Sequence, residues 1–549
     1  MVTAATRGGK LRSTLAWFVP SFFVIGDRAT DCLYVLQLER YMAGRYRGWM
    51  ARHWRQVLPP ATIGIHAGTV GVAIVLTLAG LPFLGPVIAW WGGGQALLRT
   101  FRSLQVSQRL GWTARAVRVV SLAAIGGGLL LGALVRAAVV GLPPFWWVAG
   151  AVGALAVLDL AVPALVWIAA AVAGPGERAL GLRYLAQAQA RMRQFPGRVL
   201  GITGSYGKTS TKYVVADLLG IAYRVFKTPA GVNTTMGITR VVREDLRDDY
   251  QYFVVEMSAY GPGEIREVCD LVHPALGILT AVGVQHLERF GTPERIAEAK
   301  YELIAALPAG APAVINADDP VCRRLAERAR AEGKRVLLYG LEDRPGLVVR
   351  GLDLMTSARG TRFQAVMDGA MEVFDTKLLG RWNISNILAG IAAAGECGVP
   401  LSAMKSAVAA LAPAPRRLEI HEEGGIVRIL DVANANPRGA EMALEVLGQF
   451  AGGARILITP GMVELGPIEA EENRRFGECA AAVCDYVLLV GPEQTRPIRE
   501  GLTGKGFPAD RILVARHPGE VGDLLAPIVK PGDVLLYENR LPDTYLEVN

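Results

Sequence analysis

The sequence predicts a helical transmembrane module followed by two α/β domains. Before residue 177 the chain is strongly apolar, and between Val57 and Leu98 it contains no Asp, Glu, Lys or Arg. After residue 177 short aliphatic strands alternate with helical segments, which is typical of open, mostly parallel sheets. One of these strands runs directly into a glycine-rich loop and a helix, at residues 199–211.

The composition agrees with a membrane protein. The 549 residues are 51% hydrophobic and have a mean hydropathy of +0.30. The formal net charge of +8 indicates nucleic-acid binding only weakly. Arginines that border apolar spans account for much of this charge, so we expect no nucleic-acid partner. The six cysteines show no metal-ligand spacing, so we expect reduced thiols.

The first part of the chain, residues 1–56, ends in a basic and aromatic segment. Arginines alternate with tyrosine and tryptophan between residues 40 and 55. This pattern suits a helix that lies at a membrane surface, so membrane lipid is an expected partner.

The second part, residues 57–176, predicts about four transmembrane helices. The uncharged run is long enough for two spans of ~20 residues each, and further apolar runs follow at residues 119–140 and 145–173. The segment before Val57 and the loop at residues 99–118 are both basic, so the positive-inside rule places both in the cytoplasm. We therefore expect a multi-pass protein of the cell membrane whose catalytic domains are cytoplasmic.

Asp159 lies inside the fourth predicted span. An intramembrane carboxylate is unfavourable and often functional. We favour a structural explanation, in which Asp159 pairs with Arg136 or lies where the long segment exceeds the bilayer thickness.

The loop at residues 199–211 (VLGITGSYGKTST) predicts a nucleotide phosphate site. A strand, a glycine loop and a helix together turn backbone N–H groups toward a phosphate. Lysine adds a mobile positive charge and threonine a hydroxyl for Mg²⁺. A glycine-rich surface turn would not explain why a lysine and two hydroxyls follow at once. The predicted nucleotide-binding residues of the loop are Gly204, Ser205, Tyr206, Gly207, Lys208, Thr209 and Ser210.

Two domains follow the apolar module. In the predicted central domain, residues 177–412, a buried strand ends in Glu256, where such folds hold Mg²⁺. Residues 347–379 resemble β-hairpins around an Asp-Gly turn and form a small β part. The C-terminal domain, residues 413–549, again alternates strand and helix in a Rossmann-like manner, but its glycines form no dinucleotide fingerprint.

Several motifs of residues 180–549 resemble the ATP-dependent Mur ligase family, and within it the members that add a D-alanyl-D-alanine dipeptide to a muramoyl tripeptide. They are the glycine loop, V-V-E-M ending near Glu256, H-L-E from His286, Lys300, G-R-W-N-I-S-N (380–386), P-R-R-L-E (415–419), D-V-A-N-A-N-P (431–437) and G-M-V-E-L-G (461–466).

The resemblance implies a ligase that joins a carboxylate to an amine through an acyl phosphate, with ATP and two Mg²⁺ ions. Lys208 and the loop amides would hold phosphates, and Thr209 and Glu256 would bind one Mg²⁺. His286 would help to bind the second Mg²⁺, together with Lys300 as a carbamate. From the residues alone, His286 and Lys300 would be an ordinary loop histidine and a solvated helix lysine.

The resemblance also assigns four residues outside the loop. Asn316 and Asn386 fall where the family contacts the adenine. Arg417 and Asp431 fall where the C-terminal domain supplies an arginine and a carboxylate to the site. These two can act only when that domain closes over the central one.

The sequence departs from the dipeptide-adding members in three places. One acid and a tyrosine expected before N-A-N-P are missing, since Leu430, Asp431 and Ala433 occupy those positions. A lysine-glycine-serine stretch expected near the C-terminus is replaced by residues 538–543. The apolar module stands where the family has its UDP-sugar domain. We therefore expect a changed amine pocket and a lipid-linked or membrane-derived peptide precursor of the cell envelope, with an amino acid or dipeptide as the amine.

Three other functions remain open from the sequence. A poly-γ-glutamate-type ligase would also be membrane-associated. A transport ATPase would hydrolyse ATP without an acceptor, and gives no role to Lys300. A binding protein that has lost catalysis is disfavoured because the predicted catalytic residues are intact.

Overall fold

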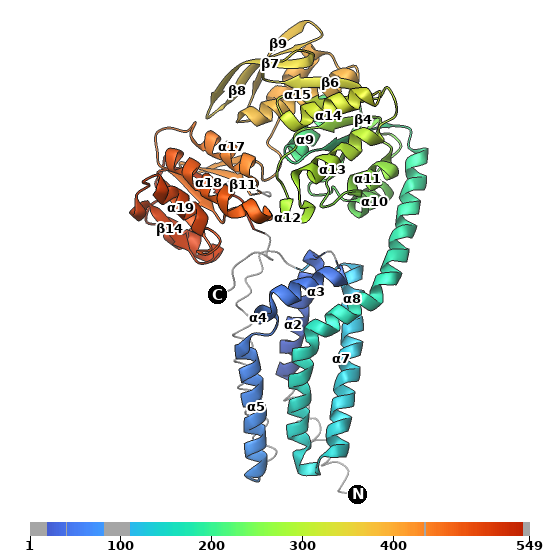
Figure 1. Ribbon diagram of the computed structural model, residues 1–549, viewed down its shortest axis with the longest axis vertical. Coiled ribbons are helices and arrows are strands. Elements are labelled where there is room, and N and C mark those ends of the chain that lie inside the picture. Colours follow the sequence, from blue (N-terminus) through green and yellow to red (C-terminus); the bar gives the residue numbers. More distant parts are fainter. Residues whose placement is uncertain (1–18, 40, 82–109, 433–434, 542–549) are drawn as a thin grey trace. The chain divides into compact units, whose positions relative to one another are not determined.

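The computed structural model describes residues 19–39, 41–81, 110–432 and 435–541 (Figure 1). The chain divides into two compact units, with the boundary between Gly181 and Leu182. This boundary lies within helix α8 (Trp147–Gln194), which continues through Pro163 and Pro175. The last part of α8, residues 178–194, leads into the strand before the glycine loop.

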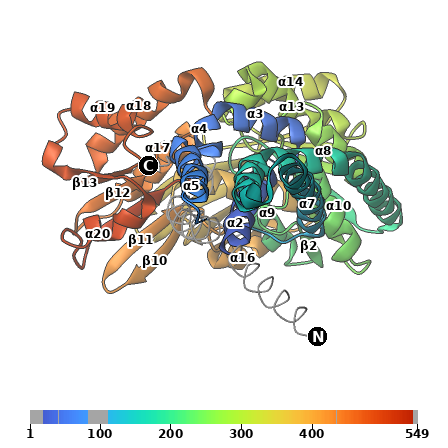
Figure 2. The same cartoon turned by 90° about the horizontal axis from the view of Figure 1, so that it is seen from below.

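Unit 1 is helical in its described residues. Its elements are α2 (Val19–Leu38), α3 (Ala43–Arg52), α4 (Trp54–Val57), α5 (Pro60–Leu78), α7 (Ala114–Gly141), the 3₁₀ turn η1 (Pro144–Trp146) and the first part of α8. Helices α5, α7 and the first part of α8 lie side by side (Figures 1 and 2). Among the described residues, three helices are long and apolar enough to cross a membrane, at Pro60–Leu78, Ala114–Gly141 and Ala149–Gln194. The predicted second span falls in residues 82–98, outside the described residues.

Helix α5 has the reverse polarity of a water-soluble helix. Its polar side chains Thr62, His66, Thr69 and Thr77 are all buried against neighbouring helices. Its exposed face is apolar, with Val75 and Leu78 among the most exposed side chains. The hydroxyls of Thr69 and Thr77 donate to carbonyls one turn earlier, at 2.7 Å in each case. A helix with apolar residues outward and polar residues inward is suited to a lipid environment.

Asp159 is paired, but the predicted partner Arg136 is wrong. Arg28 Nη1 lies 2.6 Å from Asp159 Oδ2, and His66 Nε2 lies 2.9 Å from the same oxygen. Arg28 also donates to the Val57 carbonyl at 2.6 Å. All three side chains are almost fully buried. The cluster joins α2, α5 and α8, whereas Arg136 is exposed on α7. The partner of Asp159 is thus determined by helix packing and not by proximity in the sequence.

Unit 2 contains two sheets, and the first forms the central domain. Its nine strands have the order β2-β3-β1-β4-β5-β6-β7-β8-β9. They are β1 (Arg198–Thr203), β2 (Val225–Lys227), β3 (Tyr252–Glu256), β4 (Leu276–Leu279), β5 (Pro312–Asn316), β6 (Arg335–Gly340), β7 (Leu347–Ser357), β8 (Gly360–Met367) and β9 (Ala370–Thr376). The strands from β2 to β7 pair in parallel, and the β7–β8 and β8–β9 pairs are antiparallel.

Helices cover both faces of the parallel strands because successive residues point to opposite sides. Phe253 and Val255 pack with one layer of helices, and Tyr252 and Val254 with the other. The first layer holds α10 (Thr235–Glu244), α11 (Glu264–Val272), α12 (Leu287–Phe290), α13 (Pro293–Ala306) and α14 (Pro320–Ala331). The second holds α9 (Lys208–Leu219), α15 (Arg381–Glu396), η2 (Leu401–Met404) and α16 (Lys405–Ala410).

The predicted hairpins around an Asp-Gly turn are confirmed. Strands β8 and β9 are joined by Asp368 and Gly369, with φ of 51° and 78°. Two successive positive φ values are characteristic of the tight turn that Asp-Gly favours.

The C-terminal domain has a six-stranded sheet of order β10-β11-β15-β12-β13-β14. The strands are β10 (Glu419–Glu423), β11 (Ile426–Asp431), β12 (Arg455–Thr459), β13 (Tyr486–Val490), β14 (Ile512–Ala515) and β15 (Val534–Glu538). All neighbours pair in parallel except β10 and β11. The helices are α17 (Pro437–Leu447), η3 (Gly466–Ile468), α18 (Glu469–Val483), α19 (Arg496–Gly504), η4 (Ala509–Arg511), η5 (Pro518–Glu520) and α20 (Val521–Leu525). The prediction of α/β folds with mostly parallel sheets is therefore confirmed.

The buried cluster in unit 1 gives a stability prediction. Asp159→Leu leaves Arg28 buried without its carboxylate and is expected to lower the free energy of unfolding by about 3–5 kcal/mol. The double variant Arg28→Met/Asp159→Leu should recover most of this loss, because no charge is then stranded. Thermal unfolding of the purified full-length protein measures both. Arg136→Met, the matched control, should unfold like the unaltered protein, and equal losses in the control and in Asp159→Leu would contradict the pairing.

Candidate nucleotide and ligase site

The glycine loop connects β1 to α9, and two of its glycines are required by close neighbours. A Cβ on Gly204 would lie 2.1 Å from Thr280 Oγ1, and one on Gly207 would lie 2.5 Å from Asn386 Oδ1. Both glycines also have positive φ, of 150° and 77°. The loop therefore has a cradle shape that no larger residue at these positions could form. The N-terminus of the 12-residue helix α9 begins directly at Lys208, which suits an anionic phosphate.

Hydrogen bonds hold the loop against the end of β4. Ser205 Oγ donates to the Gly283 carbonyl at 2.9 Å and accepts from Gly283 N at 3.0 Å. The Thr280 hydroxyl donates to the Tyr206 carbonyl. The loop is thus fixed by protein contacts, so the predicted phosphate site would be preorganised.

Lys208 extends along the loop. Its Nζ donates to the carbonyls of Gly204 at 2.7 Å and Ser205 at 3.0 Å. Burial, with a smaller contribution from the charge of Arg417, lowers the pKa of Lys208 to about 8, although Glu256 opposes this shift. The ammonium is placed to move from loop carbonyls to a phosphate.

Glu256 ends β3 beside this loop and is the carboxylate of the site. Its Oε1 accepts from Thr209 Oγ1 at 3.1 Å and from Asn233 Nδ2 at 3.2 Å. Its Oε2 lies 2.9 Å from the ammonium of the fully buried Lys212. Burial alone would raise the pKa of Glu256, but Lys212 and then Lys208 bring it below its ordinary value. Glu256 is therefore ionised at neutral pH.

The Glu256–Thr209 pair fits Mg²⁺. Carboxylate and hydroxyl oxygens are the hard ligands that Mg²⁺ prefers, and it usually keeps several waters and substrate phosphates in its shell. Among the described residues no group of three or more His, Cys, Asp or Glu side chains could hold a metal ion. A Mg²⁺ at this pair would accordingly depend on phosphate and water for its remaining ligands.

His286 joins the central domain to the C-terminal domain. Its Nδ1 forms a short hydrogen bond with Glu464 Oε2, and Arg289 lies 2.9 Å from Glu464 Oε1. Burial lowers the pKa of His286 despite Glu464, so its ring is poised to act as a neutral ligand. The backbone of Glu464 also accepts from Glu288 N at 3.1 Å. The contact ties the G-M-V-E-L-G motif to the H-L-E motif.

Lys300 lies on α13 with 2% of its surface exposed. Burial, and secondarily the charge of Lys208, lower the pKa of Lys300 to about 7. The nitrogen lies 5.8 Å from the ring centroid of Phe290. A substantial fraction of Lys300 is therefore a neutral amine near pH 7, unlike a solvated lysine.

Asn316 and Asn386 form hydrogen bonds with residues that adjoin the loop. Asn316 Nδ2 donates to the Thr280 carbonyl at 2.8 Å, and Asn386 Oδ1 accepts from Thr211 Oγ1 at 3.1 Å. Their contact with adenine stays a prediction.

Arg417 and Asp431 come from the C-terminal domain. Asp431 ends β11, where burial raises its pKa and the charge of Arg417 opposes that rise. The same arginine depresses the pKa of Lys208. The charge of Arg417, in the C-terminal domain, therefore acts on Lys208 on the loop of the central domain.

Four side chains of this site were not singled out from the sequence. Asn233 lies in the polar, turn-forming stretch at residues 228–238, and Glu464 lies in the G-M-V-E-L-G motif, so both had a signal. Thr280 and Lys212 had none. Lys212 resembles an ordinary helix lysine until the packing of α9 on the sheet buries it.

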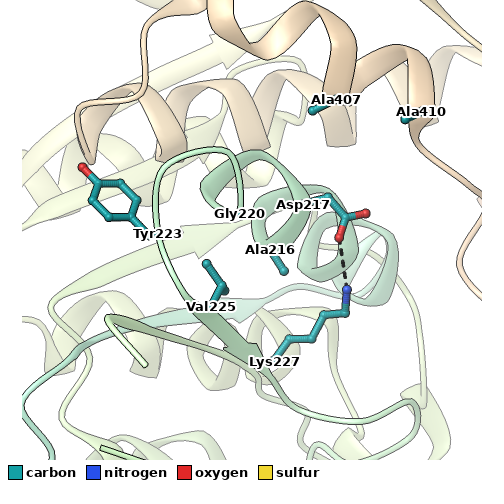
Figure 3. A pocket seen from close by; sticks show the side chains of 8 residues that line it. All are labelled: Ala216, Asp217, Gly220, Tyr223, Val225, Lys227, Ala407 and Ala410. Atoms are coloured by element: carbon teal, nitrogen blue, oxygen red, sulfur yellow. Dashed lines mark hydrogen bonds and ion pairs between the residues drawn. The ribbon is translucent and has the colours of Figure 1, made fainter. Parts of the chain in front are cut away.

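A separate pocket of about 530 Å³ lies at the other end of α9 (Figure 3). It contains one ion pair, between Lys227 Nζ and Asp217 Oδ1 at 3.1 Å. It is lined by Ala216, Asp217, Gly220, Tyr223, Val225, Lys227, Ala407 and Ala410. None of the predicted site residues lines it.

Comparisons with known proteins identify the family. The Mur ligase middle domain matches residues 202–394, and the Mur ligase glutamate ligase domain matches residues 416–537. The UDP-N-acetylmuramoyl-tripeptide–D-alanyl-D-alanine ligase of Mycobacterium tuberculosis is 31% identical over 359 residues, covering 62% of this chain and 69% of the relative. The Escherichia coli enzyme of the same name is 30% identical over 374 residues, covering 67% and 79%.

A solved structure agrees with these relatives. The MurF ligase of Thermotoga maritima in complex with ADP has a TM-score of 0.59 at 28% identity, covering 67% of this chain and 81% of that one. The chain belongs to the Mur ligase family. It is accordingly an ATP-dependent amide ligase.

Proposed function

We propose that this protein joins a carboxylate of a cell-envelope peptide precursor to an amine through an acyl phosphate, at the cytoplasmic face of the membrane. One observation carries the proposal: the ionised Glu256 is hydrogen-bonded to Thr209 beside the cradle-shaped loop, and the charge of Lys208 on this loop acts on the buried Lys300. Relatives named for a muramoyl tripeptide and D-alanyl-D-alanine supply the substrate class.

The first half-reaction brings a carboxylate against the γ-phosphate of ATP. Both are anions, so catalysis depends on neutralising charge and aligning the reactants. Lys208 and the loop amides bind the β- and γ-phosphates, and Arg417 adds charge from the C-terminal domain. Thr209 and Glu256 would hold a Mg²⁺ ion, which would neutralise further phosphate charge when bound.

Lys300 is proposed to act as a carbamate. A neutral amine attacks CO₂, whereas an ammonium does not, and the depressed pKa of Lys300 provides that amine. The amine nitrogen forms a C–N bond to CO₂, one C=O π bond opens, and the N–H proton passes to solvent. The resulting carbamate anion has two oxygens and would turn a cation near Lys208 into a ligand for a second Mg²⁺. His286, oriented by Glu464, is the other proposed ligand of that ion.

The substrate is proposed to be lipid-linked or made at the membrane. The three apolar helices, the reversed polarity of α5 and the buried Asp159 cluster support membrane insertion of unit 1. The arginines of residues 40–55 and 99–118 would attract anionic head groups, each contributing about 1 kcal/mol near the surface. Confining enzyme and substrate to one plane also raises their effective concentration.

The acyl phosphate can be detected by isotope transfer. With ATP and UDP-N-acetylmuramoyl tripeptide, or its lipid-linked form, carrying ¹⁸O in the carboxylate, one ¹⁸O is expected in the released phosphate by mass spectrometry. Lys208→Ala should abolish ADP release and keep the fold, because the half-buried Lys208 leaves no core cavity. Product formation without ¹⁸O in the phosphate would exclude the acyl phosphate.

Lys300→Ala should be nearly inactive and partly rescued by formate or acetate, which can enter the vacated space as a carboxylate. Lys300→Arg, the matched control, keeps the charge and should not be rescued. In the unaltered protein, labelled CO₂ should be incorporated increasingly as pH rises through about 7, because the neutral amine grows in that direction. Full activity without CO₂ and without added anion would contradict the carbamate.

A truncation that starts at Glu177 tests the role of unit 1. We expect it to lose most of its rate with lipid-linked precursor in vesicles relative to the full-length enzyme, while its rate with a soluble UDP-linked precursor changes little. Initial rates of ADP release measure both. Equal rates for the two proteins on the lipid-linked precursor would show that unit 1 is only a tether.

A further inference from the structure

The pocket of about 530 Å³ at the C-terminal end of α9 is bounded by three elements of the central domain. They are the last turn of α9, the edge strand β2 and helix α16 (Figure 3). A volume of this size is typical of small-molecule sites. It stays open because α9 and α16 present small residues to it, namely Ala216, Gly220, Ala407 and Ala410.

Two of the described residues that line this pocket carry opposite charges. Lys227 Nζ on β2 lies 3.1 Å from Asp217 Oδ1 on α9 (Figure 3). The two side chains are 33% and 45% exposed, and an ion pair this accessible contributes little to stability. A ligand that offers each group a new partner can therefore separate the pair at small cost.

These two groups favour a zwitterionic ligand. A simple anion would pair with Lys227 but be repelled by Asp217, and a simple cation would meet the reverse. In an α-amino acid the carboxylate and the ammonium are attached to the same carbon atom, so they can pair with two groups that lie this close together. Its side chain would lie against the apolar lining, such as Ala216 and Val225, and leave water.

The backbone connects Lys227 to the carboxylate of the nucleotide site. The next residue, Thr228, is buried, and its hydroxyl accepts a hydrogen bond from Glu256 N at 3.2 Å. Thr228 N also donates to the Val254 carbonyl at 3.0 Å. A ligand that fixes Lys227 therefore acts one residue away from the contact that holds the end of β3.

The ring of Tyr213 on α9 forms a second connection. Lys227 Nζ lies 4.5 Å from the ring centroid, and Lys212 Nζ lies 5.5 Å from it. Lys212 is the buried lysine that pairs with Glu256. Burial, and then the charges of Glu256 and Asp217, raise the pKa of Tyr213. One ring thus lies within range of both the acid of the pocket and the carboxylate of the nucleotide site.

We propose that this pocket is an effector site that binds a free α-amino acid, and that its occupation tightens nucleotide binding at the glycine loop. The ligand carboxylate pairs with Lys227 and the ligand ammonium with Asp217. Helix α9 carries the pocket at one end and Lys208 at the other, and β2 leads to Thr228. A ligand that holds these elements together favours the arrangement that binds the nucleotide. Control of amide formation by this site rests on the proposed ligase function, whereas the binding does not.

Calorimetry on the full-length protein tests the site, with alanine and leucine in both configurations as probes. At least one probe should bind tenfold more tightly than its N-acetyl and amide derivatives, each of which lacks one charge. Ala410→Trp, which fills the pocket from an exposed position and keeps both charges, should weaken that binding at least tenfold, as should Lys227→Met. The control Lys505→Met, at an exposed lysine, should bind normally. No binding of any probe, or equal binding by the two pocket variants, would overturn the site.

Titration with a non-hydrolysable ATP analogue tests the connection without turnover. The best probe, at saturation, should tighten binding of the analogue at least threefold. The analogue should tighten binding of the probe by the same factor, because coupling between two sites is reciprocal. Ala410→Trp should bind the analogue as the unaltered protein does and show no effect of the probe. Unchanged affinity for the analogue in the presence of bound probe would overturn the effector role. Absence of amide product with the unaltered protein would instead reject the ligase function, while the two binding results still decide the pocket.

Discussion

The predicted nucleotide site depends on one ionised carboxylate, Glu256, whose pKa is lowered by two lysines. Lys212 contacts Glu256 directly, and Lys208 lies on the loop. The buried Lys300 is within range of the charge of Lys208, and both of these lysines have depressed pKa values. Positive groups therefore gather in a poorly hydrated place. A polyphosphate would relieve their repulsion, and this is how the same residues are proposed to bind ATP and to accept a reaction between two anions.

The interface between the two α/β domains concentrates on Glu464. Its carboxylate contacts both His286 and Arg289, and its backbone contacts Glu288. This one residue orients a proposed metal ligand and anchors the domain that carries Arg417 and Asp431. Closure of the C-terminal domain and assembly of the proposed second metal site would therefore be coupled through the same side chain.

The parts of the site that follow from local sequence could be predicted, and those that follow from packing could not. The glycine loop, the strand ending in Glu256 and the Asp368-Gly369 turn need only a few neighbouring residues. The roles of His286 and Lys300 came from family motifs and not from their local patterns. Lys212 was missed because only the packing of α9 buries it, and Asp159 was given the wrong partner because Arg28 is 131 residues away. A charged residue inside an apolar helix indicates that a partner exists but not which helix supplies it.

The buried polar face of α5 has a consequence for biogenesis. His66 and its acceptor Asp159 are 93 residues apart in the chain. At about 5–20 residues per second of synthesis, roughly 5–20 s separate their emergence from the ribosome. If unit 1 is inserted as proposed, α5 enters the bilayer with His66 and its threonines facing lipid or insertion machinery. The packing of α5 is completed only after α8 has been synthesised. Until then, another protein has to shield the polar side chains of α5.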